Sequence, residues 1–179
     1  WANHKITHRT AQLLALAERI EANKPELAAA VCMEVGRCLR ECEAEIDKTV
    51  DLIRYYAKLA PELLDSKTIT TQASLSQVRF EPLGVVLAVM PWNYPVWQIM
   101  RFAVPALCAG NACLVKPAPS VAQVTAKLMA LVDEAMPLHA SYIEHDLIET
   151  AIEHADAMAF TGSTDTGRYL ASLAGKHIK

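Results

Sequence analysis

The 179-residue sequence lacks an excess of basic residues, since 17 Lys and Arg stand against 20 Asp and Glu and the formal net charge is -3. Binding along a nucleic acid requires a basic surface that neutralises several phosphates, so no nucleic-acid partner is expected. Long apolar runs are also missing, because the longest, 84–90 and 102–110, are far shorter than the roughly 20 residues that cross a bilayer. We therefore expect no membrane-embedded segment. Internal repeats and low-complexity tracts are absent as well.

The cysteines form no recognisable disulfide or metal pattern. There are five, an odd number, with no CxxC pair and no matching histidine cluster. This usage favours a reducing compartment, and we predict a cytoplasmic protein without a metal site. Cys108 lies in a helical segment of small residues, where a packing role is favoured over that of a nucleophile, which would need a positioned base.

The first third of the chain has helical periodicity. Apolar residues recur at helical spacing over 7–22 and 41–63, and Pro25 suits the first turn of an intervening helix that Gly36 would end. Residues 66–80 then alternate with a period near two, which predicts one or two extended segments. We divide the chain into a helical part (1–65), an extended connector or oligomerisation arm (66–80) and a sheet-forming unit (81–179).

The sheet-forming unit begins with a continuous apolar run that Pro91 ends, as expected of a parallel strand covered on both faces. A helix over 95–109, a strand over 112–115, a helix over 120–135 with Ser120 as N-cap, a strand over 156–160 and a helix over 164–174 are predicted to follow. This order indicates an α/β fold with a parallel sheet and flanking helices. Asn93 and Lys116 follow two of the strands, at the edge where open sheets of this class bind ligands.

The same segments resemble the NAD(P)-dependent aldehyde dehydrogenase superfamily, most closely its succinate-semialdehyde members. Two blocks carry the resemblance: Pro82, Gly84, Pro91-Trp92-Asn93, Pro95, Pro105-Ala106-Leu107, Gly110-Asn111 and Lys116-Pro117, followed by Phe160-Thr161-Gly162-Ser163 with Gly167. The resemblance implies that family's Rossmann-like fold, and the absence of a GxGxxG fingerprint agrees with its atypical way of holding the cofactor.

The resemblance also implies roles for individual residues. Asn93 is expected to donate a hydrogen bond to the oxygen that becomes negatively charged during attack on an aldehyde; from the residues alone, an Asx-turn cap is the alternative. Lys116 is expected to contact NADP or NAD, the alternative being a solvated lysine at a strand end. The remaining expected cofactor contacts are Pro91, Trp92, Gly162, Ser163 and Thr166.

The resemblance also bears on which cofactor is bound and on whether the family's catalytic residues are present. Many family members carry a glutamate where this chain has Pro119, and without that carboxylate a ribose 2′-phosphate is tolerated. Residues 137–155 match the family poorly, so the usual next strand is expected to be replaced and the adenine pocket altered. The family's nucleophilic cysteine and general-base glutamate lie downstream of the Phe160–Ser163 block, and the chain stops at Lys179.

Two functional hypotheses follow. The first is part of an aldehyde dehydrogenase that oxidises a small aldehyde, such as succinate semialdehyde, assembles as a homo-oligomer and is inactive as this chain alone. The second is a noncatalytic truncated relative that serves as a binding or assembly module. A reductase that uses Cys108 is a remote third.

Overall fold

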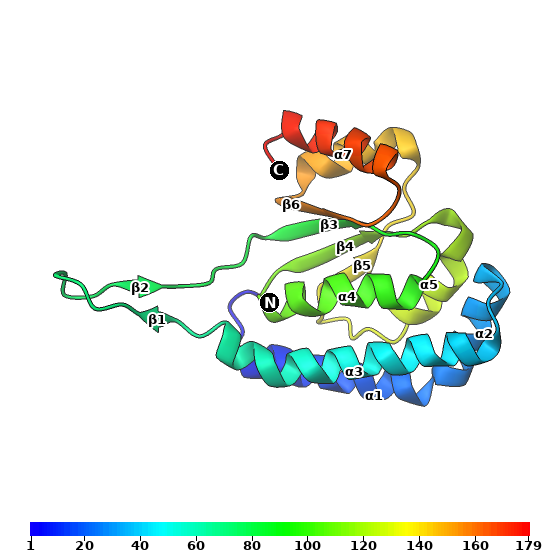
Figure 1. Cartoon of the computed structure of the whole chain (residues 1–179), viewed down its shortest axis with the longest axis horizontal. Helices are drawn as coiled ribbons and strands as arrows, with labels where there is room; N and C mark the ends of the chain where they lie inside the picture. The colour runs from blue at the N-terminus through cyan, green and yellow to red at the C-terminus, as the bar shows by residue number, and fades with distance from the viewer.

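The computed structural model describes residues 1–179, and its centre is a four-stranded parallel sheet with helices on both faces (Figure 1). The strand order is β5-β4-β3-β6. The strands are β3 (Val85–Val89), β4 (Ala112–Lys116), β5 (Leu138–Ala140) and β6 (Ala157–Phe160). The predicted α/β class with a parallel sheet and flanking helices, preceded by amino-terminal helices, is confirmed.

Two helix layers of different thickness enclose the sheet. Helices α4 (Pro95–Cys108) and α5 (Ala122–Met129) cover one face, and α6 (Ile148–His154) and α7 (Thr164–Lys176) cover the other (Figure 1). Buried Ala88 and Val115 point into the first layer, whereas buried Leu87 packs against α6 and α7. Alternate residues of β3 therefore serve opposite cores, as the two-residue period of a strand requires.

Three amino-terminal helices thicken the α4 side. They are α1 (Ile6–Ala22), α2 (Lys24–Val35) and α3 (Leu39–Leu63). Their apolar faces join α4, α5 and the sheet in one buried cluster of 29 residues. Pro25 lies in the first turn of α2, and Gly36 ends that helix with a left-handed φ of 80°. Both predictions are thus confirmed, because a missing N–H is harmless in the first turn and glycine carries no Cβ penalty at positive φ.

The segment 66–80 forms an antiparallel pair that projects from the body of the molecule (Figure 1). Its strands are β1 (Lys67–Thr68) and β2 (Gln77–Val78), both exposed. This confirms the predicted extended segments. Four large apolar side chains along it are exposed, namely Ile69, Leu75, Val78 and Phe80.

Three local predictions were wrong. Leu63, the last residue of the apolar pattern over 41–63 and therefore expected to be buried, is 50% exposed at the end of α3. The helix expected over 120–135 begins as a 3₁₀ turn, η1 (Pro119–Val121), and α5 ends at Met129. Ser120 does not cap it. Instead, the Glu34 carboxylate on α2 accepts the Gln123 and Val124 amides at 3.0 and 2.8 Å, so a distant acid satisfies the free N–H groups of the first turn.

The poorly matching region 137–155 retains its strand, contrary to expectation. Leu138–Ala140 pairs in parallel with β4, from Cys113↔Leu138 to Val115↔Ala140. A short 3₁₀ turn, η2 (His145–Leu147), then leads into α6. Burial of Leu138 and Ile148 supplies the packing that holds this segment without a glycine-containing connection. No helix combines the length and the apolar character that crossing a bilayer requires.

Candidate functional site

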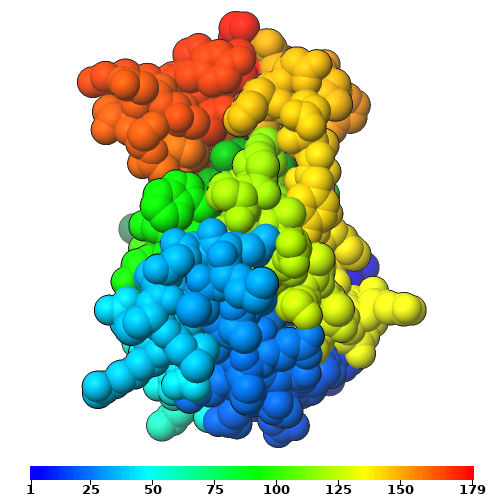
Figure 2. Space-filling model, turned by 90° about the vertical axis from the view of Figure 1, so that its right-hand side faces the viewer, coloured from blue at the N-terminus to red at the C-terminus, as the bar shows by residue number.

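The carboxyl ends of the four parallel strands meet along one edge of the sheet. The helix after β3 covers one face and the helix after β6 covers the other, so β3 and β6 flank the topological switch point where ligands of open α/β sheets bind. Figure 2 shows this side of the molecule, where green and yellow residues fill the band between the α6–α7 pair above and the amino-terminal helices below.

Backbone hydrogen bonds draw three of these strand ends together. The Met90 amide, just beyond β3, donates to the Lys116 carbonyl at 3.1 Å, and the Thr161 amide beyond β6 donates to the Val89 carbonyl at 3.2 Å. The segments predicted to bind cofactor therefore leave the sheet side by side. This spacing places the Asn93 turn between Lys116 on one side and the Gly162–Ser163 turn on the other.

Asn93 lies in an exposed turn between β3 and α4. Its side chain makes no hydrogen bond within the chain, so it does not form the Asx-turn cap considered as an alternative. Trp92, beside it, is 55% exposed and is not a core residue. Pro91 is half-buried and Pro95 is buried in the first turn of α4. The prolines thus anchor both ends of a turn whose amide remains available to a ligand.

A buried carboxylate fixes the helix that follows Asn93. Glu45 of α3 is 3% exposed, and its Oε1 accepts the amides of Val96 and Trp97 at 2.9 and 3.0 Å. Its other oxygen pairs with Arg37, whose guanidinium lies 4.0 Å from the Tyr94 ring centroid. The carboxylate thus places a negative charge at the amino end of α4, where the helix dipole stabilises it. The Arg37 guanidinium contacts the Tyr94 ring of the same turn, so the turn is held from both sides.

Sequence reasoning missed this group of Glu45, Arg37 and Tyr94, which supports the site. The available signal was the position of Glu45 on the buried stripe of α3, between Cys42 and Thr49. A carboxylate on such a stripe needs a partner, because an unpaired buried charge is costly. The same elements border a cavity of about 280 Å³, lined by Glu41, Ala44, Glu45, Lys48, Tyr94 and Trp97.

Lys116 is a buried lysine without a protein partner. It is 5% exposed, and its ammonium makes no hydrogen bond or ion pair within the chain. It lines a cavity of about 200 Å³ at the carboxyl ends of β4 and β5. This burial and the adjoining cavity favour a ligand contact over the alternative of a solvated strand-end lysine. An unpartnered cation beside a cavity fits a group rich in hydroxyls or phosphate.

The turn after β6 is shaped by packing and capping. A Cβ at Gly162 would lie 2.5 Å from the Phe160 ring, so any larger residue there would force the ring to move. The Ser163 hydroxyl shares a 2.9 Å hydrogen bond with the Thr166 hydroxyl and accepts the Thr166 amide at 3.4 Å, as the N-cap of α7. Arg101, exposed on α4, donates to the Thr161 hydroxyl at 3.4 Å.

The buried thiols are unsuited to nucleophilic chemistry. Cys108 is 1% exposed, and burial raises the pKa of its thiol to about 11 although Arg9 opposes the shift. Burial likewise raises the pKa of Cys113 to about 12. Both are protonated near neutral pH, whereas nucleophilic attack requires a thiolate. No group of three His, Cys, Asp or Glu side chains has the arrangement of a metal site.

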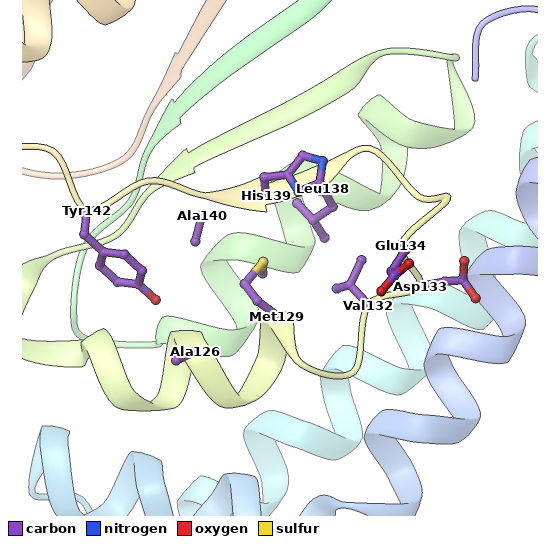
Figure 3. Close-up of a pocket in the computed structure, with 9 residues that line it drawn as sticks. All are labelled: Ala126, Met129, Val132, Asp133, Glu134, Leu138, His139, Ala140 and Tyr142. Carbon is purple, nitrogen blue, oxygen red and sulfur yellow. The ribbon is translucent and has the colours of Figure 1, made fainter.

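A larger cavity, of about 490 Å³, lies between α5 and the outer edge of β5. Figure 3 shows Met129, Val132 and Leu138 lining it, with Asp133 and Glu134 towards one end and Tyr142 at the other. Neither Lys116 nor the turns that follow β3 and β6 contribute to its wall. It meets the cavity beside Lys116 at Tyr142, which lines both, and otherwise lies apart from the convergence of strand ends described above.

The whole chain matches the model of a single protein family. The aldehyde dehydrogenase family model matches residues 1–179. The chain belongs to the aldehyde dehydrogenase family. The resemblance predicted from the Pro91–Asn93, Lys116–Pro117 and Phe160–Ser163 segments is thereby confirmed.

Several of the relatives that resemble the chain are named succinate-semialdehyde dehydrogenases. It is 34% identical over 185 residues to the succinate-semialdehyde dehydrogenase [NADP(+)] of Deinococcus radiodurans, with 100% of the chain and 39% of that protein covered. It is 37% identical over 171 residues to a probable succinate-semialdehyde dehydrogenase [NADP(+)] of Synechocystis, with 91% and 37% covered. The chain thus spans about two fifths of the length of these relatives.

Solved structures agree in fold. Succinic semialdehyde dehydrogenase from Streptococcus pyogenes, in complex with NADP+, has a TM-score of 0.90 and 30% identity, with 100% of this chain and 41% of that chain covered. Betaine aldehyde dehydrogenase from Staphylococcus aureus, in complex with NAD+, has a TM-score of 0.92 and 25% identity, with 100% and 37% covered. The sheet and its flanking helices therefore belong to this dehydrogenase fold.

Proposed function

We propose that this chain is the cofactor-holding part of an NAD(P)-dependent aldehyde dehydrogenase that oxidises a small aldehyde of the succinate-semialdehyde type. The observation that carries the proposal is the convergence of three polar segments at one sheet edge: the Asn93 turn, buried Lys116 and the Gly162–Ser163 turn. The names of the relatives support the substrate class and NADP or NAD as the cofactor.

Each segment has a part in holding the cofactor and substrate. NAD(P), when bound, supplies the acceptor for a hydride. Lys116 donates hydrogen bonds to ribose hydroxyls or phosphate from the cavity wall, where no protein group competes for it. Pro91 and Trp92 border the cofactor after β3. Gly162, Ser163 and Thr166 present a close-packed turn to it after β6.

Asn93 acts on the substrate. Its side-chain amide, free of hydrogen bonds within the chain, donates to the aldehyde oxygen as negative charge develops there. The fixed start of α4 preorganises this donor, because Glu45 holds the Val96 and Trp97 amides. Such a donor lowers the barrier only where a nucleophile attacks the same carbonyl carbon.

The chain by itself supplies no such nucleophile near the edge. Neither the cavity beside Lys116 nor the one between α3 and the start of α4 is lined by a cysteine. The buried Cys108 and Cys113 thiols stay protonated near neutral pH. We therefore expect the purified chain to bind nucleotide without oxidising aldehyde.

Calorimetric titration with NADP+ and NAD+, alongside an assay of NADPH formation from succinate semialdehyde, tests this function. Binding without turnover supports it. Robust turnover by the 179-residue chain would refute the argument about the missing nucleophile, and the absence of binding to either cofactor would refute the cofactor role of the sheet edge. Lys116→Met is the matched variant, because it removes the ammonium at similar side-chain length.

A second candidate function, assembly, is favoured by the projecting β1–β2 pair. The exposed apolar side chains of 66–80 need a covering partner, and exposed strand edges readily acquire one. We propose that this arm mediates homo-oligomerisation in the cytoplasm. Light scattering of the wild type and of Leu75→Ser/Val78→Ser tests it, with a smaller species expected for the variant; equal masses for both would refute the role of the arm.

A further inference from the structure

A second basic side chain lines the cavity beside Lys116. His145, the first residue of η2, lines the same cavity of about 200 Å³ as Lys116. The two come from separate segments, Lys116 from the end of β4 and His145 from the connection after β5. Lys116 is buried and His145 is exposed, so together they reach from the cavity wall to its mouth.

The remaining wall leaves these basic groups largely unopposed. The other lining residues are Pro117, Pro119, Ala122, Tyr142, Ile143 and Glu144. Glu144 is the single carboxylate among them, and it is exposed and forms no ion pair. The Tyr142 hydroxyl donates to the Ala122 carbonyl at 3.3 Å, so its proton is already used. Pro119 contributes neither charge nor a hydrogen-bond donor.

Two nitrogen donors facing one cavity suit a phosphate monoester better than a ribose hydroxyl pair. A phosphate dianion has three terminal oxygens that accept charge-assisted hydrogen bonds from lysine and histidine. A neutral 2′-hydroxyl gains little from the second nitrogen. The absence of a carboxylate at Pro119 also removes a group that would repel such a dianion.

We propose that His145 is a specificity-determining residue that binds the ribose 2′-phosphate of NADP, with Lys116 contacting the same nucleotide from the buried wall. The inference rests on the proposed cofactor function and adds to it a preference for the 2′-phosphorylated cofactor. His145 donates a ring N–H to a phosphate oxygen, and no covalent step is involved.

Adenosine 2′,5′-bisphosphate and 5′-AMP separate this role from cofactor binding in general, because they differ only by the 2′-phosphate. Both are titrated calorimetrically into the wild-type chain and into His145→Gln. In the variant, we expect the affinity for the bisphosphate to fall about three- to tenfold, the loss of one charge-assisted hydrogen bond, and that for 5′-AMP to change less than about twofold.

Two further variants serve as controls. His139→Gln removes a histidine of β5 that lines the cavity between α5 and β5 (Figure 3) but not the one beside Lys116, and it should leave both affinities unchanged. His145→Lys restores a cationic donor and should recover the affinity for the bisphosphate. A purely structural role of His145 would not be rescued by lysine, nor would it discriminate between the two nucleotides.

The outcomes distinguish the two proposals. If 5′-AMP binds and His145→Gln leaves the ratio of the two affinities unchanged, the specificity role is refuted while the cofactor site stands. A wild-type chain that binds 5′-AMP more tightly than the bisphosphate also refutes it. Failure of the wild type to bind either nucleotide overturns the cofactor function and the specificity role together.

Discussion

Polar side chains at the two ends of the sheet differ in what they contact. Near the amino ends of the strands, Asn111 accepts the Leu83 and Gly84 amides at 2.7 and 3.2 Å and donates to the Ala106 carbonyl at 3.2 Å. Asp156 accepts the Val85 amide at 2.8 Å. At the carboxyl ends, Asn93 and Lys116 form no side-chain hydrogen bond within the chain.

The difference separates polar groups that maintain the fold from those available to a ligand. The Asn111 amide serves free backbone groups at a crossing of the chain, so its hydrogen-bonding capacity is used internally. The chemically identical Asn93 amide lies in an exposed turn and keeps its capacity for a ligand. Mutations at the amino ends and in the supporting helices should therefore affect stability, and mutations at the carboxyl ends should affect binding.

The largest loss of stability is expected for Glu45→Ala. The substitution removes the acceptor of two amides at the start of α4 and leaves the Arg37 guanidinium partly buried without its carboxylate. Breaking a buried ion pair from one side costs about 3–5 kcal/mol, and we expect a decrease of that size in the free energy of unfolding, measured in urea.

The matched control is Glu41→Ala, an exposed acid one turn earlier on α3. It should change the unfolding free energy by less than about 0.5 kcal/mol. Equal effects of the two substitutions would show that the Glu45 contacts contribute nothing beyond those of a surface acid. The role of Glu45 in holding the Asn93 turn would then be wrong.

The two asparagines give a smaller but more direct comparison. Asn111→Ala leaves the Leu83 and Gly84 amides without an acceptor, whereas the Ala106 carbonyl still accepts the backbone amide of position 111, and we expect a loss of about 2–3 kcal/mol in the unfolding free energy. Asn93→Ala should cost less than about 0.5 kcal/mol, since no contact within the chain is lost. Thermal and urea denaturation of both variants measure the contrast, and a comparable loss for Asn93→Ala would contradict it.

Local sequence patterns predicted the elements well where periodicity or a special residue dominates. The apolar run before Pro91, the positive φ at Gly36 and the strand before Thr161 follow from short-range rules. Strand β5 was missed because His139 interrupts a segment of only three residues, 138–140, whose pairing with β4 is a long-range contact.

The site was predictable only in part, for a similar reason. Asn93 and Lys116 were found because they follow apolar strands, a pattern visible in the chain. The Glu45 contacts join residues 51 and 52 positions apart, and those of Glu34 join residues 89 and 90 positions apart. Such caps depend on how the helices pack. Likewise, His145 comes near Lys116 only through the register of β5 beside β4.

Lys116→Met should cause no loss of stability but a large loss of cofactor binding. Burial of an ammonium without a partner is unfavourable, and methionine fills a similar volume without a charge, so the unfolding free energy should stay equal or rise by up to about 1 kcal/mol. NADP+ affinity should fall at least about tenfold through loss of a charged donor. Urea denaturation and calorimetry on the same preparation test both. A variant that is less stable yet binds NADP+ as the wild type does would place Lys116 among the residues that maintain the fold and remove it from the cofactor site.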